Sequence, residues 1–333
     1  MKAIVMNAPG GVDNLRMEEI EEPQLSTPSQ LKVRLHAAGI NPIDTKIRSR
    51  GVFFDNGLPA VIGCDGAGVV TEVGEAVTQF KTGDKVWFCH GGLGREQGNY
   101  AQAKVIEAHE VCAMPRNLDF VHAAAGPLVL LTAWEALFDR AQLTAGQTVL
   151  IHAGAGGVGH VAIQLAKQRG ALVATTVGSS DKADFVRELG ADLVINYREQ
   201  NFAAAINDWT QGQGVDVVFD TVGPQVFKDS IPAVAHYGAL ITLLDPGADV
   251  DFKEARTRNL RIGFELMLTP MMRDLPRARA HQIDILKSCK RMIENNQLHL
   301  HVSHVLPLEQ AAQAHALVEQ GGTQGKIVLH ISD

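Results

Sequence analysis

A cluster of glycines near the middle of the chain has the spacing of a phosphate-binding turn. In TVLIHAGAGGVGHVAIQLAKQRG, Gly154, Gly156 and Gly159 fit the pattern G-x-G-x-x-G between an apolar run and a helical pattern. Glycine permits a tight turn, a close approach of the backbone to a pyrophosphate, and close packing of helix on strand. The start of the helix, with Gly157 and Val158, offers free N–H groups and a positive dipole to phosphate oxygens. The stretch therefore predicts a dinucleotide-binding site, with a glycine turn that serves packing alone as the alternative.

The residues after the next apolar run indicate which dinucleotide is bound. An NAD site has an acidic residue about twenty positions after the turn, where it accepts a hydrogen bond from the ribose 2′-hydroxyl. At that distance the chain has instead Gly178, Ser179, Ser180 and Lys182. These residues supply hydroxyls, N–H groups at a helix start and a cation, all of which suit a 2′-phosphate. We therefore expect NADPH as the cofactor; the alternative is that Ser180 only caps a helix and Lys182 is solvated.

The elements that must position these residues alternate between strand and helix. TVLIHA, ALVATTV, DLVIN, VDVVFD and ALITLL read as strands with helical patterns between them, one of these over residues 202–209. Such alternation predicts an α/β fold with a doubly wound parallel sheet.

The chain on either side of this series has a different character. The first third is β-rich, and VHAAAGPLVLLTAWEALFDRA predicts one linker helix. Towards the end we expect a helix around residues 280–295, a strand over LHLHVSHVLPL, a helix over 309–319 and a final strand KIVLHI. We expect residues 1–122 and 264–333 to form one catalytic and substrate domain, with residues 123–263 as the nucleotide-binding domain.

The overall composition excludes several classes of protein. The formal net charge of −7 disfavours a binder of nucleic acid or of an anionic membrane, since both need a basic surface. The four cysteines (Cys64, Cys89, Cys112 and Cys289) contain no C-x-x-C pair, so neither a disulfide framework nor a structural zinc knuckle is predicted. The sequence has no apolar signal core and no apolar run of membrane-spanning length, so we expect a cytoplasmic protein.

Several motifs, taken in their order, resemble the medium-chain dehydrogenase/reductase superfamily. They are AAGINPIDTKIRSRG, GAGVVTEVGEAVTQFKTGDKV, AGAGGVG, GSSDKADFVRELGAD, INYRE and GKIVL. The chain is more closely similar to the zinc-free quinone oxidoreductase branch, which includes the zeta-crystallin-like proteins. This resemblance implies a GroES-like β-rich catalytic domain split around a central Rossmann domain, and a homodimer.

The same resemblance bears on zinc. Zinc-bearing relatives have ligands at the positions of Asn41, Cys64 and Leu128, where this chain keeps one thiol. A catalytic zinc needs three protein ligands and an open position, so Cys64 with Asp65 is not enough and we expect no metal. His299, His301 and His304 in HLHVSH alternate with apolar residues, which predicts solvated histidines on a strand rather than a metal site.

The resemblance also implies a set of site residues. Asn41 and Thr132 would lie near the nicotinamide and are the candidates for a catalytic role, with the Asn41 amide as a donor to the substrate. Val222 would lie near the nicotinamide ribose, and Tyr197 would line the adenosine phosphate unless it only packs at the sheet edge. The substrate would meet Asn41, Cys64 and an apolar wall of Phe53, Phe54 and Leu128, with Phe264 and Met267 as looser candidates; ordinary core is the alternative for such side chains.

The chemistry that remains is hydride transfer to an electrophilic carbon or a quinone. Without zinc an alcohol lacks its Lewis acid, whereas reduction of an electron-poor acceptor does not need one. We expect an NADPH-dependent reductase of quinones or α,β-unsaturated carbonyls acting on a small-molecule partner. One alternative is a trans-2-enoyl thioester or alkenal/enone reductase, although the loop GVFFDNG lacks the tyrosine donor of related enoyl thioester reductases. An NADPH-binding protein with a structural or sensing role and no catalysis is the alternative from another class.

Overall fold

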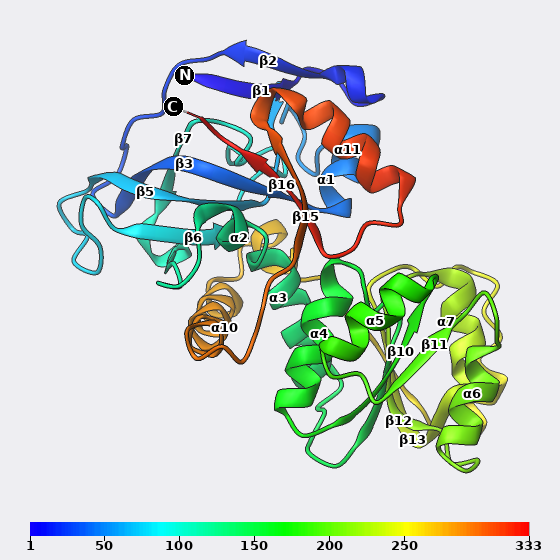
Figure 1. Ribbon diagram of the computed structural model, residues 1–333. Helices are drawn as coiled ribbons and strands as arrows, with labels where there is room; N and C mark the ends of the chain where they lie inside the picture. Colours follow the sequence, from blue (N-terminus) through cyan, green and yellow to red (C-terminus); the bar gives the residue numbers. More distant parts are fainter. Residues whose placement is uncertain (333) are drawn as a thin grey trace. The chain divides into compact units, whose positions relative to one another are not determined.

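The chain folds into two compact units, and the computed structural model describes residues 1–332. The first unit combines Met1–Val129 with the segment from Leu268 onward, and the second is Leu130–Met267 (Figure 1). The limits expected from the sequence, 122 and 263, fall several residues before these joints. The first joint lies inside a helix, α3 (Pro127–Trp134), where no turn residue marks a boundary. Within residues 1–332, no helix is both long enough and apolar enough to cross a bilayer.

The second unit contains the predicted parallel sheet. Its six strands are all parallel and lie in the order β11-β10-β9-β12-β13-β14. The strands are β9 (Thr148–Ile151), β10 (Leu172–Val177), β11 (Leu193–Asn196), β12 (Val215–Asp220), β13 (Val234–Thr242) and β14 (Arg261–Phe264). This is the order of a doubly wound dinucleotide-binding sheet, in which the direction of winding reverses between the first and fourth strands, here β9 and β12. The predicted doubly wound sheet is confirmed.

Helices cover both faces of this sheet, as its strand sequences require. The strands are continuous apolar runs, because each is buried on both sides; Leu150, Val218 and Leu240 are fully buried in one core cluster. Figure 1 shows α4 on one side of the strands and α6 and α7 on the other. The helices are α4 (Gly157–Gln168), α5 (Ser180–Glu188), α6 (Phe202–Trp209), α7 (Pro224–Ser230) and α8 (Lys253–Thr257), with a π-helical segment η3 (Glu135–Arg140) and a 3₁₀ turn η4 (Ile231–Ala233).

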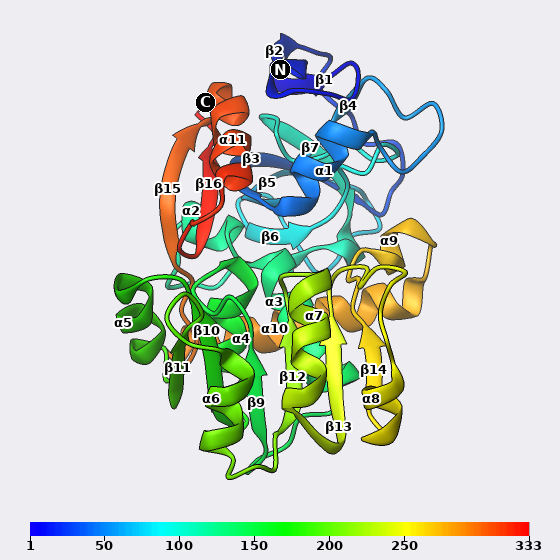
Figure 2. The same ribbon diagram turned by 90° about the vertical axis from the view of Figure 1, so that its right-hand side faces the viewer.

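The first unit is built on a small antiparallel sheet and a larger, mainly antiparallel sheet, in which only the pair β15 and β16 is parallel. A three-stranded sheet has the order β2-β1-β4, and a larger one has the order β15-β16-β3-β5-β6-β8 with β7 paired to β3. The strands are β1 (Lys2–Met6), β2 (Leu15–Glu19), β3 (Gln30–Ile40), β4 (Ala60–Val61), β5 (Asp65–Val73), β6 (Lys85–Cys89), β7 (Ala103–Glu107), β8 (Cys112–Ala113), β15 (Val302–Pro307) and β16 (Lys326–His330). Ile327 of β16 pairs with Ile40 of β3, so the two ends of the chain share one sheet (Figure 2).

Helices, the longest of them α10 with 19 residues, complete the first unit. They are α1 (Pro42–Arg50), α2 (Phe120–Ala124), α9 (Thr269–Met272), α10 (Pro276–Glu294) and α11 (Ala311–Gln320), with 3₁₀ turns η1 (Val12–Asn14), η2 (Ala108–Glu110) and η5 (Leu308–Gln310). The prediction of one linker helix is wrong: Pro127, which lacks an N–H and follows Gly126, separates α2 from α3, and α3 then continues directly into the π-helical η3. The strand expected over LHLHVSHVLPL begins only at Val302, so His299 and His301 precede it.

Candidate functional site

The glycine turn joins β9 to α4 and has the shape that a pyrophosphate needs. A Cβ on Gly154 would lie less than 3.0 Å from the Thr175 hydroxyl, and one on Gly159 less than 3.0 Å from the Ala153 carbonyl, so neither position admits a side chain. Gly156 is the N-cap of α4 and makes no side-chain cap. The N–H groups of the first turn, from Gly157 and Val158 onward, are therefore without a capping side chain. The turn fits a dinucleotide, with the helix dipole directed at its phosphates.

The predicted 2′-phosphate residues lie together at the carboxyl ends of β10 and β11. The Tyr197 hydroxyl is 2.6 Å from the point where a Cβ on Gly178 would stand, so the ring lies beside this glycine. Tyr197 is 54% exposed, so part of its ring remains accessible beside the strand end. The capping alternative for Ser180 is also wrong, because the N-cap of α5 is Ser179 and its side chain makes no capping bond. No ion pair within residues 1–332 engages Lys182. The exposed Tyr197 ring thus lies beside Gly178, and the two serines and Lys182 follow that glycine at the start of α5.

The third strand end at this edge of the sheet is that of β12. The Asp220 carboxylate accepts hydrogen bonds from the N–H groups of Val222 and Gly223 at 2.9 and 3.1 Å, which shapes the turn after the strand. Burial raises the pKa of Asp220, and these hydrogen bonds oppose the shift. Val222 is left exposed at the turn. The predicted cofactor-binding residues therefore share the carboxyl edge of one sheet, where ligands of this fold bind. They are the glycine turn, the segment from Gly178 to Lys182, Tyr197 and Val222.

The candidate catalytic residues of the first unit meet in its interior. Asn41 links β3 to α1 and caps that helix together with Asp44: the Asn41 N–H donates to the Asp44 carboxylate at 2.8 Å, and the Asp44 N–H donates to the Asn41 backbone carbonyl at 2.9 Å. The Asn41 amide nitrogen donates to the Asp65 carboxylate at 2.9 Å, and the other Asp65 oxygen accepts from the backbone N–H of Leu128 at 2.8 Å. Asn41 is 0% exposed. Its amide therefore binds the buried Asp65 carboxylate, and it is not exposed at a surface where it could donate to a substrate, as had been expected.

A buried lysine that the sequence analysis did not single out completes this cluster. Lys326 is the first residue of β16. Its ammonium donates to the backbone carbonyl of Ile40 at 2.6 Å and to the side-chain amide oxygen of Asn41. It also lies 3.9 Å from the Asp65 carboxylate. A lone lysine before an apolar run carries no sequence signal of such a role. The Asn41–Asp44 capping box was readable in NPID, as an N-cap followed three residues later by an acid.

Burial dominates the electrostatics of the cluster. It raises the pKa of Asp44 to about 7 and that of Asp65 to about 6, with Lys326 opposing the shift at Asp65. It lowers the pKa of Lys326, which the two carboxylates oppose. The thiol pKa of Cys64 is raised well above its usual value by burial and by the nearby Asp44 carboxylate. Cys64 is therefore a protonated, fully buried thiol and does not line a surface for substrate, as had been expected.

These residues do not fit a catalytic zinc. The Asn41 side-chain oxygen already accepts a hydrogen bond from the Lys326 ammonium, Leu128 contributes only its backbone N–H, and Cys64 is the only thiol at the three positions. A zinc ligand set needs three deprotonated or neutral donors around an open position. Across residues 1–332, no three His, Cys, Asp or Glu side chains are placed to hold a metal ion. In the HLHVSH segment, Leu298 and Leu300 are buried while His299 is exposed.

The expected apolar wall is only partly at the surface. Phe53 is exposed, and the Arg95 guanidinium lies 4.8 Å over the half-buried ring of Phe54. Leu128 is largely buried, as is Met267, whereas Phe264 on β14 is exposed.

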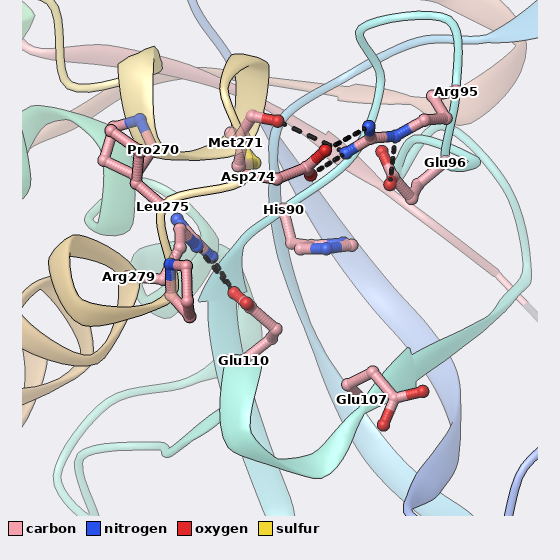
Figure 3. A pocket seen from close by; sticks show the side chains of 11 residues that line it. His90, Arg95, Glu96, Glu107, Glu110, Pro270, Met271, Asp274, Leu275 and Arg279 are labelled. Atoms are coloured by element: carbon pink, nitrogen blue, oxygen red, sulfur yellow. Dashed lines mark hydrogen bonds and ion pairs between the residues drawn. The ribbon is translucent and has the colours of Figure 1, made fainter.

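A pocket of about 390 Å³ lies elsewhere in the first unit, and its walls are charged (Figure 3). Figure 3 shows Arg95 reaching Asp274 on one wall and Arg279 reaching Glu110 on another. Its lining residues are His90, Arg95, Glu96, Glu107, Glu110, Pro270, Met271, Asp274, Leu275, Pro276 and Arg279. None of the predicted substrate-binding residues is among them, so this pocket is not the predicted substrate site.

A buried histidine below the glycine turn makes the second unit sensitive to acid. The two ring nitrogens of His152 lie 3.2 Å from the Thr176 hydroxyl and 2.9 Å from the Ser230 hydroxyl, and burial lowers the pKa of the ring to about 3. The ring is thus neutral in the folded protein, and its stabilising contribution is lost as the pH falls from about 6.5 towards 3. Between pH 6.5 and 5 we expect the free energy of unfolding of the wild type to fall by about 1.5 kcal/mol more than that of His152→Gln.

Urea unfolding of both proteins at the two pH values measures this difference. Asp44 and Asp65, whose pKa values are raised, act with the opposite sign, but they are present in both proteins and cancel in the comparison. His304→Gln, which changes an exposed histidine, serves as the control and should follow the wild type. Parallel pH profiles for wild type and His152→Gln would contradict the assignment.

Comparisons with known proteins show that the chain is similar to two dehydrogenase family models and to characterised reductases. Residues 27–116 match the family model described as alcohol dehydrogenase GroES-like domain, and residues 189–329 match the one described as zinc-binding dehydrogenase. The chain is 33% identical to a 2-haloacrylate reductase of Burkholderia sp, over 98% of both chains. It is also 33% identical to a quinone oxidoreductase of Pseudomonas aeruginosa, over 98% of this chain and 99% of the relative.

A solved structure agrees with these matches. The quinone oxidoreductase of Escherichia coli, complexed with NADPH, superposes with a TM-score of 0.88 at 29% identity, over 99% of this chain and 100% of the other. The expected fold class, a GroES-like domain combined with a Rossmann-type parallel sheet, is confirmed.

Proposed function

Because this chain belongs to the medium-chain dehydrogenase/reductase superfamily and is an NAD(P)-dependent oxidoreductase, we propose that it uses NADPH to reduce quinones or α,β-unsaturated carbonyls without zinc. The observation that carries the proposal is the group of residues at the ends of β10 and β11. Ser179, Ser180 and Lys182 stand there, and the end of β10 is followed by Gly178 rather than by the acid that binds a ribose 2′-hydroxyl; Asp181 lies one residue further on than Ser180, in the first turn of α5. The relatives named as a quinone oxidoreductase and a 2-haloacrylate reductase support an electron-poor acceptor.

The residues of the chain have separable tasks in this reaction. When bound, NADPH supplies a hydride, which carries two electrons to the acceptor, and a proton from water completes the reduction. The glycine turn and the start of α4 hold the pyrophosphate, and Lys182 with the two serines holds the 2′-phosphate. In the first unit, Asp65 holds the first turn of α3 through the Leu128 N–H. No residue is assigned as proton donor, and the loop of residues 51–57 contains no tyrosine.

The cofactor preference gives a direct prediction. NADPH should bind at least tenfold more tightly than NADH, about 1.4 kcal/mol, because the 2′-phosphate gains charge-assisted hydrogen bonds. Lys182→Ala should weaken NADPH and leave NADH nearly unchanged, as measured by fluorescence titration. Lys253→Ala, which removes an exposed lysine at the start of α8, is the matched control. Equal affinities of the wild type for the two cofactors would refute the preference.

The function itself is tested by NADPH oxidation with a panel of acceptors: quinones, enals, enones, 2-haloacrylates and enoyl thioesters, with simple alcohols and NADP⁺ for the reverse direction. We expect turnover with quinones or conjugated carbonyls, poor oxidation of alcohols, and no change after a chelator. Stoichiometric zinc by elemental analysis would overturn the zinc-free proposal. Tight NADPH binding without turnover of any acceptor would favour the non-catalytic binder instead. A homodimer remains a prediction from the resemblance.

A further inference from the structure

The ammonium of Lys326 is buried among acidic and thiol groups at the end of β3. Lys326 is 3% exposed, and the titratable groups that act on it are Asp65, Asp44, Cys89 and Cys64. Asp65 is also fully buried, so its carboxylate has no access to water. A buried carboxylate needs a cation and hydrogen bonds to remain charged, because desolvation is costly. The ammonium provides such a cation at 3.9 Å.

A continuous series of hydrogen bonds leads from this lysine to α3. The ammonium donates to Asn41, the Asn41 amide donates to one oxygen of Asp65, and the other oxygen accepts from the N–H of Leu128. Leu128 lies in the first turn of α3, the helix that also carries Thr132. Every link in the series is buried, so a change at Lys326 is passed on to α3 rather than absorbed by solvent.

Two of these residues, Asn41 and Leu128, stand where the zinc-bearing relatives have metal ligands, although the donors present here do not fit zinc. We propose that the Lys326 ammonium takes over the organising role of a metal cation in this unit and is a positioning residue for the reaction. It holds Asn41 and Asp65, and through them the start of α3, in the arrangement that hydride transfer requires. This inference rests on the proposed reductase function and adds to it the residue that replaces the metal.

The test compares Lys326→Met, which keeps most of the unbranched side chain but removes its charge, with Lys326→Arg, which keeps a cation. For Lys326→Met we expect kcat with the best acceptor to fall at least tenfold. The Kd for NADPH should stay within about threefold of the wild-type value, because the phosphate contacts lie in the second unit. The kcat of Lys326→Arg should be at least fivefold higher than that of Lys326→Met. Lys85→Met, at the exposed first position of β6 in the same sheet, is the matched control and should retain the wild-type kcat.

The outcomes separate this inference from the proposed function. Wild-type protein that oxidises no NADPH with any acceptor would overturn both. An active wild type with an equally active Lys326→Met, or with equal losses in the Met and Arg variants, would overturn the role of Lys326 alone.

A neutral double variant covers the case in which Lys326→Met does not fold. Asp65→Asn combined with Lys326→Met removes both charges and keeps a carbonyl oxygen to accept from Leu128. A folded double variant with kcat at least tenfold below the wild type would support the inference, and one with full activity would refute it.

Discussion

Replacing Gly159 by alanine is expected to weaken NADPH binding at least a hundredfold, about 2.7 kcal/mol. The new Cβ would lie less than 3.0 Å from the Ala153 carbonyl oxygen and from the Gly154 backbone. Both neighbours are main-chain atoms, so no change of side-chain rotamer relieves the contact and the turn itself must move. Its movement displaces the N–H groups of the first turn of α4, which hold the pyrophosphate.

Fluorescence titration with NADPH measures this effect, and the thermal midpoint of Gly159→Ala reports whether the variant is folded. Gly11→Ala is the matched control, because its Cβ would meet nothing within 4 Å and its φ of −70° suits any residue. The assignment of the turn would be refuted by a folded Gly159→Ala protein that binds NADPH within threefold of the wild type.

Arg279→Met should destabilise the first unit by about 3–5 kcal/mol, since it leaves a buried carboxylate without its partner. Arg279 on α10 donates to Glu110 at 2.6 Å from Nε, to Gln282 at 2.7 Å and to the Cys89 carbonyl at 3.0 Å. Both charged side chains are largely buried. Methionine fills most of the space but satisfies none of these acceptors.

Urea unfolding gives the free energy difference, and Arg187→Met is the control. Arg187 pairs with Asp184 at 2.7 Å on the surface of α5, where the two side chains are 58% and 75% exposed. A surface pair of this kind contributes about 0–1 kcal/mol, because water screens it. Equal losses in the two variants would contradict the importance of burial at Arg279.

The nucleotide-binding part of the site could be predicted from sequence because its signals are local. The glycine turn, the strand before it and the helix after it are contiguous, so backbone sterics and capping determine the turn within about one dozen residues. Regular alternation of strands and helices then requires a parallel sheet, which brings the ends of β10, β11 and β12 to one edge. Lys182 could therefore be assigned to this edge from the residues alone, whereas Tyr197 and Val222 were assigned from the resemblance to the family.

Predictions from local sequence were wrong where a single helix-breaking residue interrupts a longer periodic pattern, or where a strand needs a neighbour. The apolar run from 121 to 141 has helical spacing throughout, yet Pro127 divides it. The strand expected from Leu298 starts at Val302, because alternation of apolar and polar residues does not by itself supply a neighbouring strand. The neighbour, β16, pairs with β15 only from Val302 onward.

The interior of the first unit was decided by tertiary structure alone. Asn41 and Lys326 are 285 positions apart, and they meet only because β16 pairs with β3 and brings its first residue to the end of that strand. The resemblance to the family made Asn41 a candidate, with its amide as a donor to the substrate, whereas the fold buries that amide between a cation and a carboxylate. Residue type and spacing determine what a short segment can bind, because the responsible groups are covalent neighbours. Which charges compensate one another in a core depends on long-range packing, since the cost of a buried charge is decided by whatever the rest of the chain places beside it.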